Sequence, residues 1–236
     1  MNILVTGATG FVGHWLTQKL VDDGHQVRII HREGSNLSGF EDLKIERVIA
    51  DVTNLESLKI ALEDIEVVFH LAGVIGYCKE QRPLMDKVNV EGTRNIVELC
   101  KNNPRIQRFI HMSSVVAVGA SFDKTPLNED SPFNVEHLNL GYFETKRQAE
   151  DIVKAACSEG SLDAVIINPS TIYGPGDSVK GSRRVQLNVL KGRFPFYTSG
   201  GVSIVHIEDV IYCLVQAWKK GETGERYIVS LSLIHI

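Results

Sequence analysis

This sequence of 236 residues has few cysteines, no cluster of histidines and no surplus of basic charge. Its four cysteines are widely spaced and form no CxxC pair, so we expect neither a disulfide framework nor a zinc site, and we expect reduced cysteines mostly in the core. The eight histidines are equally scattered, without an HExxH pattern or a paired spacing on one helical face. No bound metal is therefore expected.

The chain also lacks a long hydrophobic run. Its 25 basic and 29 acidic residues give a net charge of −4 and a pI near 6.1, which disfavours binding to nucleic acid or to an anionic membrane. Hydrophobic residues make up 43% and charged residues 23%, as in soluble globular proteins. A strand is expected almost at Met1, without room for a signal peptide. We therefore expect a cytoplasmic protein whose partner is a small molecule, with no nucleic acid and no membrane.

Short apolar stretches alternate with stretches of helical periodicity along the chain. Strands are expected over residues 2–6, 26–31, 45–50, 66–70, 106–112 and 162–167, and helices over 11–23, 54–64, 84–102 and 141–159. Strands separated by helix-sized crossovers predict a doubly wound α/β fold with a parallel sheet covered on both faces. A closed eightfold barrel is the rival, but it normally needs a longer chain. Residues 120–139 predict a long loop, of the kind that often carries function.

Three glycines, Gly7, Gly10 and Gly13, lie between the first expected strand and the first expected helix. Glycine at such positions allows a tight turn, a close approach of the backbone to a pyrophosphate, and close packing of the helix on the sheet. The free backbone N–H groups and the positive end of the helix then form an anion site. A merely structural turn is the alternative, but the place of the pattern at the first strand–helix junction favours dinucleotide binding.

This glycine spacing resembles that of the short-chain dehydrogenase/reductase superfamily, in its extended branch of epimerases, dehydratases and reductases. Further segments match that branch in order. They are Asp51-Val52, His70-Leu71-Ala72-Gly73, Asn89-Val90-Glu91-Gly92-Thr93, Ser113-Ser114, Tyr142-Phe143-Glu144-Thr145-Lys146, Asn168-Pro169-Ser170 and Tyr173-Gly174-Pro175-Gly176. The chain is most similar to the dihydroflavonol-reductase-like and hopanoid-associated sugar-epimerase-like group.

The resemblance covers residues 1–230 and implies a division of the chain into two parts. Residues 1–168 are expected to form an NAD(P)-binding Rossmann domain. Residues 169–236 are expected to form an incomplete C-terminal substrate-binding region, with some parts returning to the Rossmann domain. Similar proteins usually continue for roughly another hundred residues, and residues 231–236 resemble a translated sequencing adapter. We therefore expect a truncated reading frame.

The end of the second expected strand bears on which dinucleotide binds. An acidic residue there binds the ribose 2′-hydroxyl, whereas an arginine binds a 2′-phosphate. The sequence has Arg32 followed by Glu33, so NADP is favoured over NAD; Arg32 as a solvated loop charge, with Glu33 facing the ribose, is the alternative. Cofactor contacts implied by the resemblance lie at Gly7, Thr9, Gly10, Phe11, Val12, Gly13, Arg32, Asp51, Val52, Leu71, Ala72, Gly73, Asn89, Lys146, Asn168, Pro169 and Ser170.

Tyr142 and Lys146 are four residues apart in an expected helix, so their side chains share one face. A free tyrosine titrates near pH 10, and a nearby ammonium is expected to lower the pKa of Tyr142. By resemblance, Lys146 also holds the nicotinamide ribose, and Ser114, five residues before Gly119, orients the substrate oxygen. Taken singly, these residues could be a chance helical pair and a strand-end cap; together they form the expected catalytic set. Val118 replaces a tyrosine that relatives often carry, which weakens a sugar-nucleotide assignment.

The expected function is an NAD(P)-dependent oxidoreductase that reduces a carbonyl or oxidises an alcohol on a small organic molecule. A nucleotide-sugar epimerase or dehydratase with tightly bound NAD, a steroid-type 3β-hydroxyl dehydrogenase and a non-catalytic NAD(P)-binding sensor are the alternatives. Residues 194–197 are a candidate wall of the substrate pocket or plain core. Glu208 or Asp209 is expected to cap a helix beside His206. A homodimer through two long helices is typical of the family that the chain resembles.

Overall fold

Seven strands form the main sheet, and every neighbouring pair in it is parallel. The computed structural model describes residues 1–123, 125–177, 188, 190–193 and 200–235. The strands are β1 (Asn2–Thr6), β2 (Gln26–His31), β3 (Ile45–Ile49), β4 (Val67–His70), β5 (Arg108–Met112), β6 (Ala164–Pro169) and β9 (Arg226–Val229). Their order is β3-β2-β1-β4-β5-β6-β9, so the direction of winding reverses between β1 and β4. In such sheets, ligands bind at the carboxyl ends of the strands beside this switch point.

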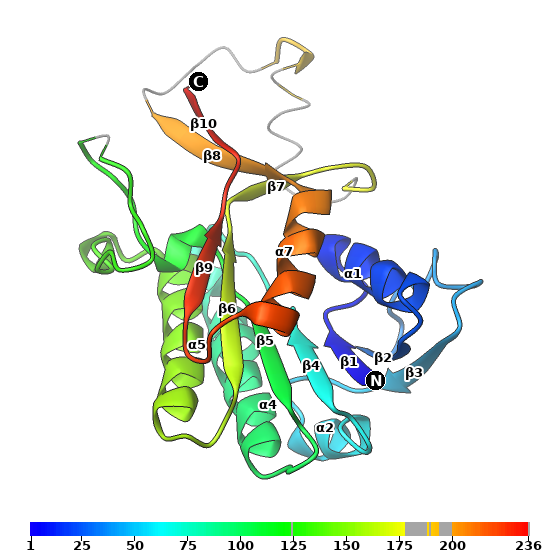
Figure 1. Cartoon of the computed structure of the whole chain (residues 1–236). Coiled ribbons are helices and arrows are strands. Elements are labelled where there is room, and N and C mark those ends of the chain that lie inside the picture. The colour runs from blue at the N-terminus through cyan, green and yellow to red at the C-terminus, as the bar shows by residue number, and fades with distance from the viewer. Residues whose placement is uncertain (124, 178–187, 189, 194–199, 236) are drawn as a thin grey trace.

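Helices cover both faces of the sheet, as Figure 1 shows. One face carries α1 (Phe11–Asp22) and α7 (Ile207–Lys220), and the other carries α2 (Leu55–Ala61), α4 (Gly92–Lys101) and α5 (Gly141–Ser158). Successive strand residues serve opposite cores, because side chains alternate along a strand. Val5 packs into the core under α1 and α7, whereas Leu4 packs into the core under α2, α4 and α5. Burial on both faces explains why the strands are continuous apolar runs in the sequence.

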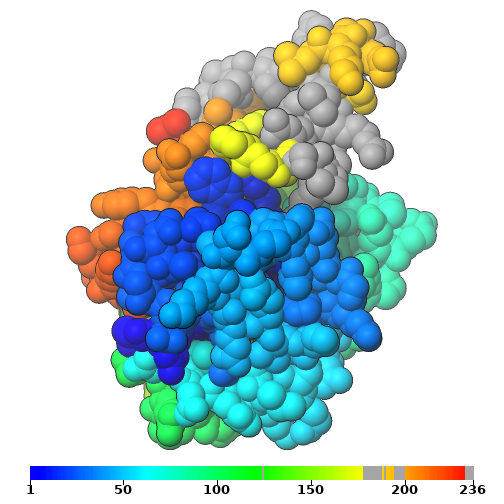
Figure 2. Space-filling model, turned by 90° about the vertical axis from the view of Figure 1, so that its right-hand side faces the viewer, coloured from blue at the N-terminus to red at the C-terminus, as the bar shows by residue number. Residues whose placement is uncertain are grey.

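A second sheet of three strands lies beyond the carboxyl ends of the main sheet (Figure 1). Its strands β7 (Thr171–Tyr173) and β8 (Gly201–His206) are parallel, and β10 (Ser232–His235) pairs antiparallel with β8. In Figure 2 the yellow atoms of the segment after β7 lie against the blue atoms of α1. There Trp15 Nε1 donates to Pro175 O at 3.2 Å, which ties this segment to the first helix of the main sheet.

The doubly wound parallel fold expected from the sequence is confirmed. The helix expected over 84–102 is present but interrupted, because α3 (Arg82–Met85) leads into a π-helical segment, η2 (Asp86–Glu91), before α4 begins. Single π-helical turns often occur at functional sites. The long loop expected over 120–139 contains only a short 3₁₀ turn, η4 (Glu136–Leu138), within its described part.

Two other expectations concern a helix cap, which is wrong, and a pocket wall, which the structure does not describe. The helix cap expected at Glu208 or Asp209 is wrong, because both acids lie in the first turn of α7, where they face the positive end of the helix dipole. The cap is His206, whose Nδ1 accepts from the Glu208 N–H at 3.4 Å. Residues 194–197, the candidate pocket wall, lie outside the described residues. No helix in the described ranges is both long and apolar enough to cross a membrane.

Candidate active site

The turn between β1 and α1 leaves no space for a side chain at two of its glycines. Gly7 has a φ of +69°, and a Cβ on it would lie 2.7 Å from Ala72 N. A Cβ on Gly13 would lie 2.3 Å from Gly7 O. Gly10 precedes α1 without a side-chain capping bond, and the first turn of the helix carries no acidic residue. The backbone N–H groups at this end of α1 are therefore open to the oxygens of a pyrophosphate.

The apolar side chains next to this turn belong to the core. Val12 is buried under α1 and α7, and Leu71, just after β4, packs against the same core. Phe11 packs beside Gly174, where an added Cβ would lie 3.3 Å from its ring. Phe11 and Leu71 are only partly buried in this core, and Thr9 is exposed.

A chain of hydrogen bonds joins the ends of β1 and β4 to α4. Ala72 N donates to Thr6 Oγ1 at 3.1 Å, and Thr93 Oγ1 donates to Asn89 O at 2.6 Å. His70 lies between the two threonines, with Nδ1 2.8 Å from Thr6 Oγ1 and Nε2 3.0 Å from Thr93 Oγ1. The Thr93 hydroxyl proton is already used, so His70 Nε2 carries the ring proton and Nδ1 accepts from Thr6. Burial lowers the pKa of His70 to about 3, which keeps the ring neutral.

Asn89 extends this chain to the start of α5. It is buried on η2, where its Oδ1 accepts from Val74 N at 2.8 Å and its Nδ2 donates to Val74 O at 2.9 Å. The same Nδ2 donates to Thr145 Oγ1 at 3.2 Å, and Thr145 Oγ1 donates to Tyr142 O at 3.1 Å. Asn89 therefore fixes the segment after β4 and the first turn of α5 together. Its direct contact with a cofactor stays a prediction.

The three expected catalytic residues meet at the carboxyl edge of the sheet. Lys146 is buried, and its Nζ donates to Met112 O, at the end of β5, at 2.9 Å. A Cβ on Gly73 would lie 3.5 Å from the same Nζ, so the amine lies between the segments that follow β4 and β5. Tyr142, one helical turn earlier, is half-buried, and the Ser114 side chain lies near enough to lower the pKa of its hydroxyl. The structure thus places Ser114 near Tyr142, and Lys146 one turn further along the same helix; their action as one catalytic set stays a prediction.

Burial dominates the protonation of this group. It raises the pKa of Tyr142 above its ordinary value, and the hydrogen bond with Ser114 offsets only part of the rise. Burial also lowers the pKa of Lys146 to about 8, while the Glu150 carboxylate acts in the opposite direction. The lowered Tyr142 pKa expected from the sequence is therefore wrong for this structure, because loss of solvation outweighs the opposite effect of Ser114. At neutral pH Tyr142 carries a proton that it can donate.

The residues expected around the adenosine follow β2 and β3. Arg32 is exposed directly after β2. Asp51, after β3, accepts through Oδ1 from the N–H and the hydroxyl of Thr53, both at 2.8 Å. Val52 is buried, and a Cβ on Gly92 would lie 2.7 Å from its Cγ2, so this side chain serves the core. Exposed Arg32 and Glu33 and half-buried Asp51 are thus polar side chains that this region offers to a ligand.

Asn168, Pro169 and Ser170 lie where β6 ends. Asn168 is fully buried, and its Nδ2 donates both to Ser114 O, at 2.9 Å, and to Glu150 Oε1. Pro169 is the last residue of β6, and Ser170 N donates to Val229 O at 3.0 Å. The structure therefore brings Asn168 into direct contact with the Ser114 backbone.

A buried ion pair lies behind this edge and was missed by the sequence-based reasoning. Glu150 is fully buried and Arg226 is 5% exposed, with Arg226 NH1 3.3 Å from Glu150 Oε2. Glu150 stands four residues after Lys146 on the same helical face, a spacing that could have singled it out. Arg226 is 76 residues further along the chain, and no local pattern connects it to this site.

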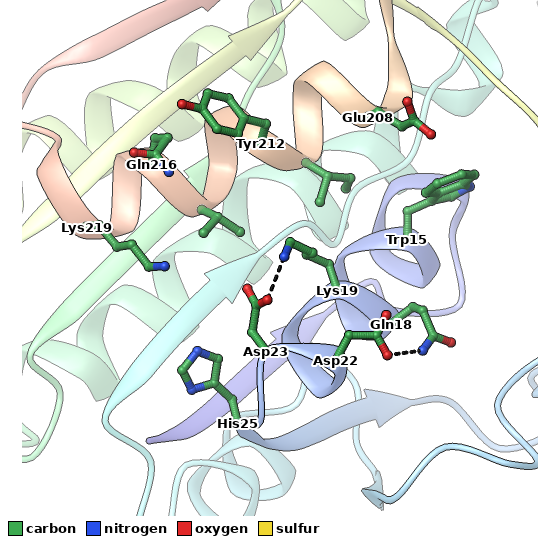
Figure 3. A pocket seen from close by; sticks show the side chains of 12 residues that line it. Trp15, Gln18, Lys19, Asp22, Asp23, His25, Glu208, Tyr212, Gln216 and Lys219 are labelled. Carbon is green, nitrogen blue, oxygen red and sulfur yellow. Dashed lines mark hydrogen bonds and ion pairs between the residues drawn. The ribbon is translucent and has the colours of Figure 1, made fainter.

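A groove of about 760 Å³ runs between α1 and α7, and none of the expected site residues lines it (Figure 3). Lys19 and Asp23 line the groove and form an ion pair in which Nζ and Oδ1 are 2.5 Å apart, drawn as a dashed line in Figure 3. Trp15 and Glu208 mark one end, and His25 marks the other. The groove is therefore a feature separate from the group around Tyr142.

Comparison with known proteins identifies the family. The model of the NAD dependent epimerase/dehydratase family matches residues 3–230. The chain belongs to this family. A putative dihydroflavonol 4-reductase of Synechocystis sp. is 34% identical over 95% of this chain and 66% of its own length. Sterol demethylase protein B of Methylococcus capsulatus is 33% identical over 98% of this chain and 70% of its own length.

Solved structures of this epimerase/dehydratase type have the same fold. The crystal structure of gox2253 superposes with a TM-score of 0.91 at 33% identity, covering 99% of this chain and 71% of that chain. The dTDP-glucose 4,6-dehydratase of Bacillus anthracis, in complex with NAD, superposes with a TM-score of 0.86 at 22% identity, covering 100% of this chain and 77% of that chain. The present chain thus spans about two thirds of the length of the curated relatives named above.

Membership of the epimerase/dehydratase family confirms the resemblance stated from the sequence, and with it an NAD(P) cofactor and an enzyme family of oxidoreductases, epimerases and dehydratases. The turn at Gly7 and Gly13 fits such a cofactor, because a Cβ at either position would collide with neighbouring backbone, so that only glycine allows the tight turn at the start of α1 that a pyrophosphate needs. The choice between NAD and NADP stays a prediction, as do the roles of the individual site residues. Within the described ranges, no group of His, Cys, Asp and Glu is arranged to hold a metal ion.

Proposed function

We propose that this chain carries the active site of an NADPH-dependent reductase of uncharged, largely apolar ketones or aldehydes. The observation that carries the proposal is that the Ser114 and Tyr142 side chains lie near each other at the carboxyl edge of the sheet, with the buried amine of Lys146 one turn further along α5. Two hydroxyl donors at one point, backed by a cation, suit a substrate oxygen that becomes more negative during the reaction. Among the curated relatives, the names include dihydroflavonol 4-reductase and 3-beta-hydroxysteroid dehydrogenase.

Each residue has one task in this reaction. A bound nicotinamide supplies the hydride that reduces the carbonyl carbon. Ser114 Oγ–H donates to the carbonyl oxygen and holds it in place. Tyr142 transfers its phenolic proton to that oxygen, so that the carbonyl, having gained a hydride on carbon and a proton on oxygen, becomes an alcohol. The Lys146 ammonium stabilises the Tyr142 phenolate until solvent returns the proton.

The protonation state of Tyr142 supports the direction of reduction. Because burial raises the pKa of Tyr142, the phenol holds its proton at neutral pH and acts as an acid. Lys146, with a pKa of about 8, is mostly charged at pH 7 and loses its charge as the pH rises through 8. We expect reduction to be fastest near neutral pH.

The surroundings of Tyr142 favour an apolar substrate. The segments that flank it, residues 74–85 and 120–140, carry a group of exposed apolar side chains: Ile75, Tyr77, Leu84, Phe122, Leu138 and Leu140. Arg82, the cation that reaches the start of α5, is already bound by Asp86 and Glu144. Residues 120–139 contain four acidic residues and one lysine, a balance that disfavours the diphosphate of a nucleotide sugar.

A variant of Tyr142 tests the proposed chemistry. Tyr142→Phe removes the donated proton and should lower kcat for NADPH-dependent ketone reduction by at least about 10²-fold, with the Kd for NADPH unchanged. Tyr212→Phe, an exposed tyrosine on α7, is the matched control and should keep full activity. The assay follows NADPH consumption with a panel of apolar ketones and aldehydes. Unchanged turnover in Tyr142→Phe, or epimerisation of a UDP-sugar without net NADPH consumption, would contradict the proposal.

Arg32 is the proposed contact of the NADP 2′-phosphate, because it is the exposed cation at the end of β2. A charge-assisted hydrogen bond contributes about 1.5–3 kcal/mol, so Arg32→Ala should weaken NADPH binding by roughly 10- to 100-fold and leave NADH binding unchanged. Glu33→Gln is the control and should change neither affinity. Fluorescence titration of the unmodified chain and of both variants measures their affinities for NADPH and NADH; tighter binding of NADH than NADPH by the unmodified chain would reverse the assignment.

The division of the chain at residue 168, a cytoplasmic location and a homodimer through two long helices stay predictions from the sequence. Light scattering of the purified protein at several concentrations tests the dimer. A mass equal to one chain at every concentration would contradict it.

A further inference from the structure

Arg226 and Glu150 form a charged pair in a place where charge is costly. Both side chains are buried, and Arg226 NH1 lies 3.3 Å from Glu150 Oε2. A buried ion pair is weak evidence for stability, because the loss of solvation can exceed the attraction between the charges. Such a pair persists where its hydrogen bonds have a further use. The bonds made by each partner indicate what that use is.

The Glu150 side of the pair leads to the catalytic serine. Glu150 Oε1 accepts from Asn168 Nδ2, and the same Nδ2 donates to Ser114 O at 2.9 Å. Glu150 thus fixes the amide of Asn168, and the amide in turn fixes the backbone of Ser114. The hydroxyl of Ser114 is the group that meets Tyr142.

The Arg226 side leads to the loop that precedes the catalytic helix. Arg226 Nε donates to Glu129 O at 2.7 Å, and Arg226 NH2 donates to Ser131 O at 3.0 Å. Glu129 also binds back to β9, because its Oε1 accepts from Ile228 N at 2.8 Å. One guanidinium therefore holds three points of the chain at once: helix α5, through Glu150, and two points of the loop between η3 (Val115–Ala117) and α5.

We propose that Arg226 and Glu150 are positioning residues for the reaction, which together set the backbone of Ser114 and the substrate-side loop relative to α5. The proposal rests on the proposed function, since it concerns the same site. Neither residue touches the reacting atoms. Their contribution is geometric, and a shift of about 1 Å in catalytic groups can cost as much as 10²-fold in rate.

Arg108 provides a matched control within the same chain. It makes the same kinds of bond as Arg226: one ion pair, to Asp163, and two bonds to backbone carbonyls, Ala217 O and Gly221 O. It begins β5, however, and so lies at the amino end of the sheet, opposite to the catalytic edge. A purely structural role predicts similar effects of substitution at the two arginines.

The first experiment compares Arg226→Lys with Arg108→Lys. Lysine keeps the charge but loses the planar set of donors that serves three acceptors. We expect both variants to lose stability in urea, and only Arg226→Lys to lower kcat/KM for ketone reduction, by roughly 10- to 100-fold. The Kd for NADPH should stay within about twofold of the unmodified chain in both. Equal losses of kcat/KM in the two variants would overturn the proposal.

The second experiment separates folding from positioning. Apolar replacement of a buried pair is often neutral or stabilising, so the double variant Glu150→Leu with Arg226→Met should fold even if a single variant does not. It removes the acceptor of Asn168 and both loop bonds, and kcat/KM should again fall by roughly 10- to 100-fold, mainly through kcat. A stable double variant with full kcat/KM would overturn this proposal alone. Absence of NADPH-dependent turnover in the unmodified chain would overturn the proposed function, and this proposal with it.

Discussion

The two faces of the main sheet bury different chemistry. Under α1 and α7 the central strands are apolar except for Arg108 at the start of β5, with Ile3, Val5, Val67, Phe69, Ile110, Val165 and Ile167. Under α4 and α5 the same strands begin apolar, with Leu4, Val68, Phe109 and Ile166. Two residues later on that same face they become polar, with Thr6, His70, His111 and Asn168, all buried. The helices opposite contribute Asn89, Thr93, Thr145, Lys146 and Glu150, which are also buried.

The apolar face contributes mainly to the stability of the fold, whereas the polar layer sets the positions of the site residues. Apolar burial is non-directional and scales with area, so the α1 and α7 face can stabilise the fold without specifying any single contact. Buried polar groups need partners at defined distances and angles, so the layer under α4 and α5 specifies where the backbones of Ala72, Ser114 and Tyr142 lie. Substitutions on the two faces should therefore change different measurable quantities.

Truncation of Leu214 should give the largest loss of stability. This fully buried residue of α7 packs on the apolar face, and Leu214→Ala should lower the free energy of unfolding by about 2–5 kcal/mol. At a temperature where the variant is folded, its kcat/KM should match that of the unmodified chain. Urea unfolding and NADPH oxidation measure the two quantities. A large loss of kcat/KM in the folded variant would mean that the faces are not separable.

His70 and His111 form a sharper comparison within the polar layer. Their rings stack with centroids 5.5 Å apart, yet His70 bonds through both nitrogens, and neither nitrogen of His111 has a hydrogen-bond partner in the described part of the chain. His70→Leu leaves the Thr6 hydroxyl proton without an acceptor and removes the donor to Thr93 Oγ1, and it should cost about 1–3 kcal/mol for each buried group left unpaired. His111→Leu removes two unpaired groups and should be nearly neutral. Equal losses of unfolding free energy for the two variants, measured in urea, would show that the hydrogen bonds of His70 do not distinguish the two histidines.

The same two rings predict a smaller, pH-dependent effect. Burial lowers the pKa of His70 to about 3 and lowers that of His111 well below its ordinary value. As the pH falls below about 6.5, the unfolded chain takes up protons on both rings and the folded chain does not. The free energy of unfolding should therefore decrease toward acid pH, by up to about 1.4 kcal/mol per pH unit for each ring.

Urea unfolding between pH 7 and pH 5 measures this slope, and His111→Leu should remove the part that His111 contributes. A slope that is identical in the variant would exclude His111 as a source. Between pH 7 and pH 8 both rings are already mostly neutral in the unfolded chain, so only a small slope from them is expected there.

Local patterns were enough to predict much of the site. The glycines of the β1–α1 turn lie within a few residues of one another, and so do Tyr142 and Lys146. The geometry of the first group follows from one turn, and that of the second from one helix. The alternation of strands and helices predicted the doubly wound sheet for the same reason. The π-helical segment was not predictable in this way, because a single extra residue per turn leaves the apolar periodicity of residues 84–102 almost unchanged.

The sequence by itself determined the order of the elements, the glycine turn between β1 and α1 that fits a dinucleotide, and the face of α5 that carries Tyr142 and Lys146. Tertiary structure alone decided that Tyr142 keeps its proton, because its pKa depends on how much solvent the assembled fold removes. It also decided that Arg226 meets Glu150, since residues 76 positions apart become neighbours only when β9 joins the sheet beside β6. Hydrogen-bond partners and solvation are properties of packed elements, and no stretch of local sequence contains them.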